Sequence, residues 1–269
     1  MSAYFKIVDG CYVGNSWAAS PWLPTQLGGH GVCGILAREL ETHSPGKDFI
    51  PARMTVDLLK PVLNEPVVVQ SSIVRDGRRV RVVDASIVQH GVVRVRATAM
   101  FLAISQQPPG AVWQAAHQFP APTHRLDAPG GDGLLFKSGD ADWSEDFVAG
   151  QNDERKYSWQ NVWPLVEGEQ ITPFQRAAFV ADTSNMVCNW GTEGIGYINT
   201  DMTMTLSRLP VGPELGLLAQ DQVAAAGISV GTATMYDRLG PLGTCVLTGL
   251  SNAQHQIDMP TWIAHFAEA

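Results

Sequence analysis

Apolar residues take alternate positions along two stretches of this chain, residues 80–89 (VRVVDASIVQ) and residues 92–102 (VVRVRATAMFL). This spacing is typical of strands that bury one face of a sheet. Arg94 and Arg96 fall between the apolar positions, so they are predicted to lie on the solvent-facing surface. Turns are predicted at residues 75–79 (RDGRR) and at residues 90–91, which separate the strands of this region.

Two other segments follow the spacing of an amphipathic helix. From Gly29 to Thr42, apolar side chains recur every three or four residues with charged ones on the opposite face. Residues 44–46 (SPG) end that pattern. The second predicted helix runs from Pro173 to Met186, and its proline suits a first helical turn.

Helix and strands follow one another in the same order twice. Residues 55–102 begin with TVDLLKP, residues 204–250 begin with MTLSRLP, and each stretch follows one of the predicted helices. The offset near 150 residues predicts a duplicated unit. It is carried by three pairs of residues: Pro61 with Pro210, Lys60 with Arg208, and Gly77 with Gly227. Two related units should pack against each other, and the seam between them is the expected place for a site.

The division into domains follows from this repeat. Residues 1–105 are predicted to form the first unit, residues 106–170 a connector, and residues 171–269 the second unit. The connector is rich in Pro, Gly and Ala, which interrupts both helical and strand patterns. It also carries three tryptophans: Trp143, Trp159 and Trp163. We expect these aromatic side chains to hold the connector along the surface or over a groove.

Composition narrows the class of protein. With 269 residues and 45% hydrophobic content, the chain can bury a large core. A net charge of −8 opposes general nucleic-acid binding. No apolar run approaches the roughly 20 residues that span a bilayer, and the N-terminus lacks a signal-peptide pattern. We therefore expect a cytoplasmic protein without a membrane partner.

The four cysteines are Cys11, Cys33, Cys188 and Cys245. Their positions match neither a CxxC motif nor the Cys/His spacing of zinc sites. They are predicted to be reduced thiols, and no metal or cofactor is expected.

Four stretches stand out in combination: GGHGVCGILARELE, ARMTVDLLKPV with its RDGRRV turn, RAAFVADTSN, and YINTDMTMTLSRLPVG. Together they resemble the acyl-CoA thioesterase II-like double-hotdog proteins of bacteria, over residues 1–105 and 170–250. The resemblance implies an α+β fold, a tandem (double) hotdog in which a curled antiparallel sheet wraps each of two helices. It also implies hydrolysis of the thioester between an acyl group and coenzyme A. Hotdog sheets often associate edge to edge, so a homodimer is expected.

Within this resemblance, Asp182 in FVADTSN takes the place of the catalytic aspartate. A carboxylate beside Phe179 and Val180, near the seam, would have a raised pKa and could accept a proton from water near neutral pH. From the residues alone, Asp182 could instead cap local backbone together with Ser184 and Asn185.

Gly29, His30 and Gly31 open the first predicted helix and are the candidates for stabilising the thioester oxyanion. Free N–H groups at a helix start point outward with a favourable dipole, and glycines let a substrate approach them. The same glycines are equally expected if they only permit close packing of helix and sheet. His30 could itself act as a base, although a histidine without an acidic partner is more often a polar residue at the rim.

The chain departs from the family pattern at two positions. Where the family has a Thr and a Gln that hold the attacking water, this chain has Asn199 and Leu247. Asn199 can hydrogen-bond a water molecule, whereas Leu247 cannot. This degenerate set weakens the prediction of efficient hydrolysis more than that of acyl-CoA binding. Three residues could replace the lost polar group: Thr203, Asp201 and Asn185.

Phosphate contacts for coenzyme A are predicted at four arginines: Arg75, Arg78, Arg79 and Arg208. Guanidinium groups suit phosphate oxygens, but charged side chains in hairpin turns are more often merely solvated. An acyl channel is predicted between the two helices, although core packing explains its lining equally well. That lining comprises Val32, Ile35, Leu36, Phe179, Met186 and Trp190.

Three functions follow, in decreasing order of preference. The first is a hydrolase of coenzyme A thioesters in lipid metabolism, working by general-base catalysis without a covalent intermediate. The α/β-hydrolase route is not supported, because no serine is predicted to sit in a GxSxG elbow: residues 227–231 (GISVG) match the letters but fall at a turn between two predicted strands, not at a strand-to-helix turn. The second is a non-hydrolytic acyl-CoA or acyl-ligand binding protein of the same fold. A hydratase or dehydratase ranks last, because neither helix start pairs an Asp with a His.

Overall fold

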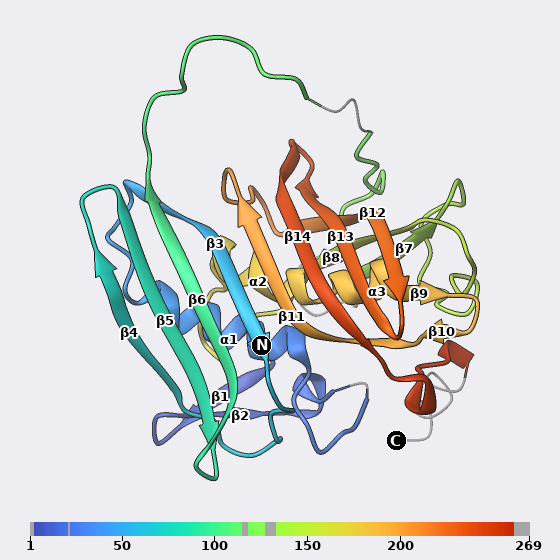
Figure 1. The fold of residues 1–269 in the computed structure, drawn as a ribbon, viewed down its shortest axis with the longest axis horizontal. Helices are drawn as coiled ribbons and strands as arrows, with labels where there is room; N and C mark the ends of the chain where they lie inside the picture. Colours follow the sequence, from blue (N-terminus) through green and yellow to red (C-terminus); the bar gives the residue numbers. More distant parts are fainter. Residues whose placement is uncertain (1–2, 21, 115–117, 127–132, 261–269) are drawn as a thin grey trace.

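The computed structural model describes residues 3–20, 22–114, 118–126 and 133–260. Ten strands within that part form a single antiparallel sheet, and the helices pack against one of its faces (Figure 1). The chain is therefore α+β, as the sequence predicted. Residues 261–269, the end of the second predicted unit, lie outside the described residues.

The first half of the sheet has the strand order β4-β5-β6-β3. These strands are β3 (Phe49–Leu58), β4 (Val69–Asp76), β5 (Val80–Gln89) and β6 (Val92–Ala103). Alternate side chains of β5 and β6 are buried, which confirms the predicted pattern. Helix α1 (Gly29–Glu41) contacts all four strands on their buried face, and Arg96 on the opposite face is exposed.

The second half has the strand order β11-β14-β13-β12, so the two halves run in mirrored order from the middle of the sheet. Its strands are β11 (Tyr197–Leu206), β12 (Glu214–Ala225), β13 (Ile228–Asp237) and β14 (Gly240–Ser251). Helices α2 (Pro173–Asp182) and α3 (Ser184–Asn189) cover this half. The halves join where β3 pairs with β11, and there the hydroxyl oxygens of Thr55 and Thr203 lie 3.1 Å apart.

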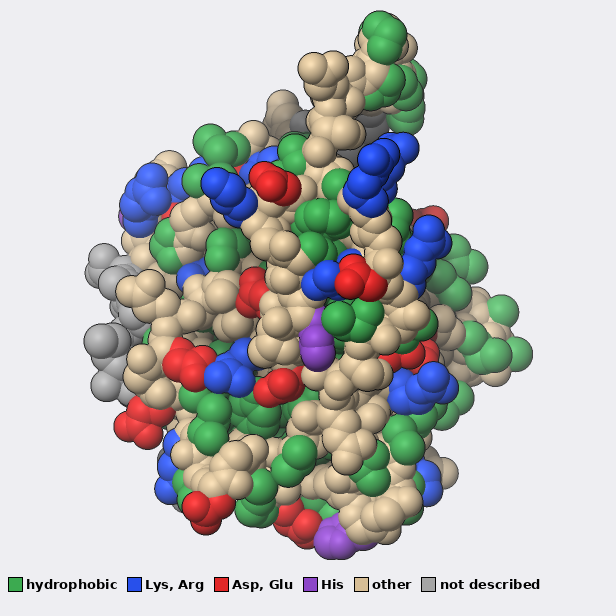
Figure 2. Space-filling model, turned by 90° about the vertical axis from the view of Figure 1, so that its left-hand side faces the viewer, with side chains coloured by type: hydrophobic (Ala, Val, Ile, Leu, Met, Phe, Trp, Pro, Cys, Tyr) green, Lys and Arg blue, Asp and Glu red, His purple; other side chains and the backbone are tan. Residues whose placement is uncertain are grey.

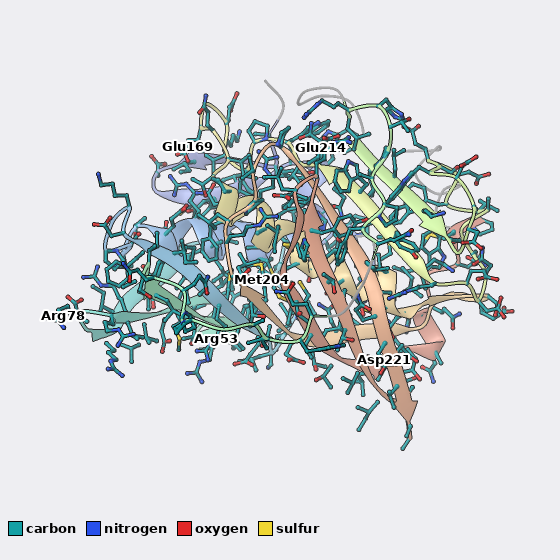
Figure 3. All side chains as sticks on the ribbon, turned by 90° about the horizontal axis from the view of Figure 1, so that it is seen from above. Arg53, Arg78, Glu169, Met204, Glu214 and Asp221 are labelled. Carbon is teal, nitrogen blue, oxygen red and sulfur yellow. The ribbon has the colours of Figure 1, made fainter. Side chains whose placement is uncertain are left out.

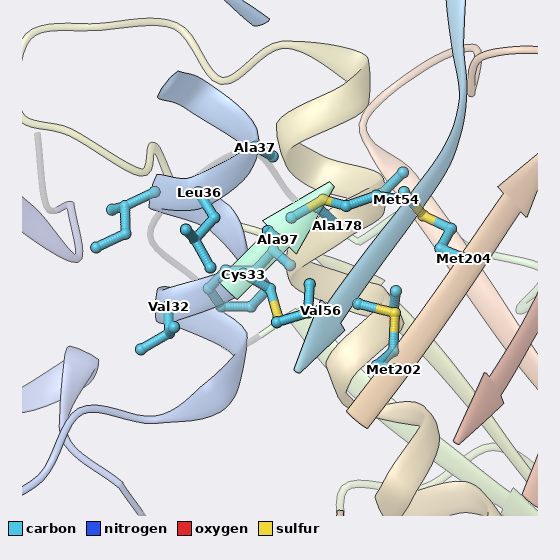
Figure 4. Close-up of a cluster of buried hydrophobic side chains, with 14 of the residues drawn as sticks. Val32, Cys33, Leu36, Ala37, Met54, Val56, Ala97, Ala178, Met202 and Met204 are labelled. Atoms are coloured by element: carbon cyan, nitrogen blue, oxygen red, sulfur yellow. The ribbon is translucent and has the colours of Figure 1, made fainter. Parts of the chain in front are cut away.

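The main core lies between this central strand pair and the helices (Figure 4). Met54 of β3 and Met204 of β11 are fully buried in one cluster with Cys33 and Leu36 of α1. Burying a side chain of this size stabilises the fold by about 1.5–3 kcal/mol relative to exposing it. All four cysteines are free thiols, as predicted.

Helices α1 and α2 lie side by side and antiparallel. Glu41, at the C-terminal end of α1, accepts hydrogen bonds from Thr172 (2.8 Å) and Gln175 (2.9 Å) at the N-terminal end of α2. Thr172 and Gln175 also form a capping box that starts α2. At the other end of the pair, Gly29 opens α1 directly beside Asp182, the last residue of α2.

The second helix ends earlier than the predicted Met186. Both the hydroxyl and the amide of Thr183 donate to the carbonyl oxygen of Val180, at 2.7 and 3.0 Å, and α3 starts as a separate helix at Ser184. A threonine side chain that competes for backbone groups tightens the last helical turn. The break leaves Asp182 at the C-terminal end of α2.

The segment predicted as a connector contains two strands, β7 (Gly133–Ser138) and β8 (Lys156–Asn161). They extend the second half of the sheet, because β8 pairs with β12. Their short apolar runs lie between Pro- and Gly-rich stretches, which is why the sequence pattern did not reveal them. Trp159 is fully buried and Trp163 nearly so, and Trp159 lies on β8 within the sheet, so this part of the segment belongs to the fold and does not merely lie along the surface or over a groove as expected.

Residues 104–114 stand off the body of the molecule (Figures 1 and 2). Val112 and Trp113 are 87% and 84% exposed. The chain returns to the surface at Pro120 and Pro122, whose carbonyl oxygens accept hydrogen bonds from Tyr236 and Arg238. Residues 104–114 are therefore separate from the core, whereas the chain around Pro120 and Pro122 packs against the second half of the sheet.

Short elements complete the described chain. They are β1 (Phe5–Val8), β2 (Cys11–Gly14), β9 (Trp190–Gly191), β10 (Gly194–Ile195) and two 3-10 turns at Ser16–Ala18 and Ala253–His255. None of the described helices has the length and apolar character needed to cross a bilayer.

Candidate active site

A cavity of about 360 Å³ opens where the two halves of the molecule meet. Its walls come from the start of α1, the junction of α2 and α3, the ends of β3 and β11, and the segment that follows β3. Most of its surface is apolar, and six of the apolar lining residues are Leu27, Val32, Leu58, Val95, Met186 and Ile198. The cavity thus lies at the seam that the repeated sequence pattern indicated.

Asp182 lies in the polar part of the cavity wall. Its carboxylate is so close to Gly29 that a Cβ on that glycine would lie 2.5 Å from Oδ1 and 2.6 Å from Oδ2. The side-chain amide of Asn199 donates a hydrogen bond to Oδ1 of Asp182 at 3.0 Å. Three residues predicted from the sequence are therefore brought together at one point.

The surroundings of Asp182 raise its pKa. The carboxylate faces the cavity but is otherwise enclosed by protein, and this desolvation raises its pKa from 3.8 to about 6. The hydrogen bond from Asn199 acts in the opposite direction. Asn185, the alternative local partner, instead donates to the carbonyl oxygen of Tyr197 at 3.1 Å. An aspartate with a pKa near 6 can accept a proton at neutral pH.

The first turn of α1 presents backbone donors to the same region. Gly28 is the N-cap residue and supplies no side-chain hydrogen bond. Within the described residues, the amides of Gly29, His30 and Gly31 have no protein acceptor, whereas the amide of Val32 donates to Gly28 at 3.1 Å. Such N–H groups carry partial positive charge and can stabilise a developing oxyanion.

The ring of His30 packs against two aromatic side chains. Its centroid lies 4.8 Å from that of Phe179 and 6.0 Å from that of Tyr4. Burial lowers the pKa of His30 to about 4, and a hydrogen bond with the backbone of Trp17 offsets this only in part. The imidazole is therefore neutral at physiological pH and a weak proton acceptor.

A β-bulge aims Asn199 at Asp182. The register of β11 against β14 shifts between Asn199 and Asp201, which leaves Thr200 as an extra residue. Met202, beyond the bulge, is fully buried toward the helices. Strict alternation from Met202 would turn Asn199 to the opposite face of the sheet, so the extra residue is what brings its amide to the cavity.

Three of the predicted phosphate contacts lie away from the cavity. Arg75, Arg78 and Arg79 surround the β4–β5 turn, and Arg78 lies at one far end of the molecule (Figure 3). On β6, Val95 lines the cavity, whereas Leu102 pairs with the start of β5 at the turn. Roughly 23 Å of extended strand separates these two positions.

Arg208, Thr203 and Leu247 have other surroundings. Arg208 forms two hydrogen bonds of 2.7 Å with the buried carboxylate of Asp237. Thr203 shares its hydroxyl contact with Thr55 at the middle of the sheet. Leu247 is a core residue that is 1% exposed. None of the three lines the described cavity.

The predicted acyl-channel residues divide into two groups. Val32 and Met186 line the cavity, whereas Ile35 and Leu36 are fully buried in the core. The remaining two, Phe179 and Trp190, are buried against other aromatic rings. Gly31 faces the core as well, since a Cβ there would lie 3.1 Å from Phe5.

Sequence reasoning did not single out several residues of the cavity wall. Lys60 follows β3, is exposed and makes no ion pair with any described residue. Trp22, Phe147 and Met259 reach the cavity from loops and from the end of the described chain. Lys60 was visible in the sequence only as the repeat partner of Arg208, because a pattern shows that a side chain is exposed but not which cavity it borders.

Family models match almost the whole chain. The acyl-CoA thioesterase N-terminal domain matches residues 18–102, and the acyl-CoA thioesterase C-terminal domain matches residues 105–250. The chain therefore belongs to the acyl-CoA thioesterase family, as its motifs indicated. No curated protein matches it.

Solved structures of low identity share the fold. The acyl-CoA thioesterase II TesB2 from Mycobacterium marinum is 14% identical with a TM-score of 0.62, over 91% of this chain and 93% of that chain. The tesB protein from Mycobacterium avium subspecies paratuberculosis is 14% identical with a TM-score of 0.63, over 91% and 94%. A protein from Alicyclobacillus acidocaldarius described as having a hot dog fold is 14% identical with a TM-score of 0.67, over 92% and 95%.

Proposed function

We propose that this chain hydrolyses acyl-CoA thioesters to a free acid and coenzyme A, with Asp182 as the general base. The observation that carries the proposal is the contact between the Asp182 carboxylate and Gly29 inside a largely apolar cavity. A proton acceptor at the end of α2 and backbone donors at the start of α1 face one space. Membership of the acyl-CoA thioesterase family supports the substrate class.

In the proposed reaction, ionised Asp182 accepts a proton from a water molecule. Asn199 donates to Asp182 through its amide nitrogen, which leaves its carbonyl oxygen to accept a hydrogen bond from that water. The water oxygen bonds to the thioester carbonyl carbon, and the carbonyl electron pair moves onto the oxygen. The amides of Gly29, His30 and Gly31 stabilise this oxyanion.

Collapse of the tetrahedral intermediate then breaks the carbon–sulfur bond. The departing thiolate takes the proton that Asp182 accepted, so the products are a carboxylic acid and the coenzyme A thiol. Asp182 returns to its ionised state. The sequence of steps uses no metal, no cofactor and no covalent enzyme intermediate.

The acyl group would occupy the apolar part of the cavity, against residues such as Val32 and Met186. Lys60 at the rim would meet the phosphates of coenzyme A, because it is an exposed cation without an ion-pair partner among the described residues. The β4–β5 arginines are too remote for that contact.

We further propose that the molecule is a tandem hotdog that arose by duplication. Mirrored strand orders on either side of the β3–β11 pair support this, as does one long helix against each half. The proposed active site then combines the free backbone amides at the start of α1, from the first copy, with the carboxylate of Asp182, from the second copy.

Thiol release from acyl-CoAs of several chain lengths tests the function. We expect turnover by the unaltered chain, and a fall of at least about 100-fold in Asp182→Asn, as for loss of a general base. Asp57→Asn, an exposed aspartate that does not line the cavity, is the matched control and should keep its activity. Equal rates in Asp182→Asn and the unaltered chain would remove Asp182 as the base.

The second candidate is a non-hydrolytic acyl-CoA binding protein. It is favoured by Leu247, an apolar core residue at a position where the family has a polar one. Calorimetric binding of an acyl-CoA without any thiol release would establish it in place of hydrolysis.

A further inference from the structure

Two side chains bond the partner strand at the bulge in β11. The carboxylate of Asp201 accepts a hydrogen bond from the amide of Thr248 through Oδ1 at 2.9 Å. The hydroxyl of Thr200 donates to the carbonyl oxygen of the same Thr248 at 3.1 Å. Both backbone polar groups of Thr248 are thus bonded by side chains from the bulge.

Asp201 does not line the cavity, so it cannot touch the substrate there. It is adjacent to the extra residue Thr200, and its parity in the strand is opposite to that of buried Met202. Any effect of Asp201 on the reaction must therefore be indirect, through the backbone of β11 that positions Asn199.

We infer that Asp201 is a positioning residue: its bond to the amide of Thr248 fixes the bulge, and the bulge holds Asn199 against Asp182. The inference rests on the proposed function for its catalytic meaning. The geometric link stands apart from it, since it consists of three hydrogen bonds and one register shift. Bulges re-aim a side chain in this way when their extra residue is held in place.

A second bulge offers a matched control. The register of β12 against β13 shifts between Ala219 and Asp221, which leaves Gln220 as the extra residue. Asp221 again follows the extra residue, and its Oδ1 accepts the amide of Gln222 at 2.9 Å. Asp221 does not line the cavity, and Figure 3 shows it well away from Met204 at the middle of the sheet.

Other groups near Asp182 must be considered in any titration. Cys33 on α1 interacts electrostatically with Asp182, and His30 and Lys60 line the same cavity. None of them belongs to the bulge. Removing the negative charge of Asp201 would by itself favour ionised Asp182 and move its titration to lower pH, whereas loss of the Asn199 hydrogen bond moves it to higher pH.

The experiment is a carboxyl-carbon NMR titration of Asp182, assigned by comparison with Asp182→Asn. In Asp201→Ala we expect the midpoint to rise by about one pH unit, as for a weakened hydrogen bond to a carboxylate. Asp201→Asn keeps an oxygen that can accept the Thr248 amide, so its midpoint should not rise. Asp221→Ala should leave the midpoint unchanged. The acid limb of the pH profile of thiol release should move with the titration.

A double variant makes the coupling explicit. If the upward shift in Asp201→Ala acts only through Asn199, the midpoint in Asp201→Ala/Asn199→Ala should not lie above that in Asn199→Ala alone, because only the downward charge effect of Asp201 then remains. Additive shifts, or an unchanged midpoint in a folded Asp201→Ala, would overturn the inference. Should Asp201→Ala not fold, Asp201→Glu keeps the charge but displaces the acceptor and should give the same upward shift. If Asp182→Asn retains full turnover, the assignment of Asp182 as the base fails, while the titration still decides whether Asp201 positions Asn199.

Discussion

The carboxylate of Asp182 occupies the space that a side chain on Gly29 would need, since a Cβ there would lie 2.5 Å from Oδ1. The glycine is not required by its backbone, because Gly29 is not one of the residues with positive φ. What requires it is the close approach of two antiparallel helices, one of which ends on the carboxylate while the other begins on the glycine.

Gly29→Ala should therefore separate activity from stability. The methyl group would push the carboxylate away from Asn199, and we expect kcat to fall at least about tenfold. Alanine has the higher helix propensity, by about 0.5–1 kcal/mol, and this gain opposes the steric cost of moving the carboxylate. The melting temperature should therefore change little. Gly191→Ala is the control, because a Cβ there would meet no atom within 4 Å. Full activity in Gly29→Ala would show that the close contact is not needed for turnover.

The rate of hydrolysis should rise with pH through the pKa of Asp182. The base is active only when ionised, and burial raises its pKa to about 6, so the rate should fall tenfold for each pH unit well below that value and level off above it. A pH profile of kcat/KM measures this limb. His30, with a pKa near 4, should contribute no limb in the same range. A profile that is flat across pH 6 would contradict the assignment of the base.

The same raised pKa should cost stability. Between pH 3.8 and about 6 the folded state keeps a proton that the unfolded chain has released, so the free energy of unfolding falls as pH rises through this window. The full loss is about 3 kcal/mol. Asp182→Asn removes it, so the variant should become more stable than the unaltered chain above pH 6. Denaturant unfolding at several pH values would reveal the difference, which should vanish below pH 3.8.

Lys60→Ala should weaken binding of coenzyme A thioesters. Loss of a phosphate contact is expected to raise KM for acyl-CoA about tenfold. KM for the matching acyl-pantetheine, which has no phosphate, should not change. Arg78→Ala is the control, because the β4–β5 turn is remote from the cavity. Equal effects of Lys60→Ala on both substrates would point to packing at the rim in place of charge.

Arg208→Ala should reduce stability and leave KM unaltered. Its partner Asp237 has a fully buried carboxylate, and Arg208 is the cation that pairs with it. Removing one member of a fully buried pair costs about 3–5 kcal/mol, and because Arg208 is 33% exposed and Asp237 keeps the amides of Val211 and Leu239 as donors, the loss should not exceed about 3 kcal/mol. Thermal unfolding together with steady-state kinetics tests this. A rise in KM with an unchanged melting temperature would instead support the contact with coenzyme A that the sequence suggested.

The alternation of apolar residues predicted β5 and β6 because each buries one face, and the repeated order of elements placed the later strands within residues 204–250. The helix starts were equally readable, from the glycines at Gly29 and the proline at Pro173. Asp182 and Asn199 were predicted from family motifs, and the structure brings them within hydrogen-bonding distance. These features are local, so that a run of neighbouring residues is enough to specify them.

Features that depend on distant contacts were not visible in the same way. The bulge at Thr200 is defined by its register against β14, and the proximity of Lys60 to the cavity depends on how the halves dock. Arg208 reads as a free cation in the sequence because Asp237 is remote from it along the chain. The strands β7 and β8 have apolar runs too short to stand out and are held by pairing with β12.

Residues 104–114 contribute no strand to the sheet, and Gly110 within them is exposed. The halves are instead held together by five residue pairs between β3 and β11 and by the bonds of Glu41 to the start of α2. We therefore expect covalent continuity at this segment to be dispensable for assembly. If the chain is divided at Gly110 and the two polypeptides are produced together, we expect them to associate and to form the complete fold, including the cavity.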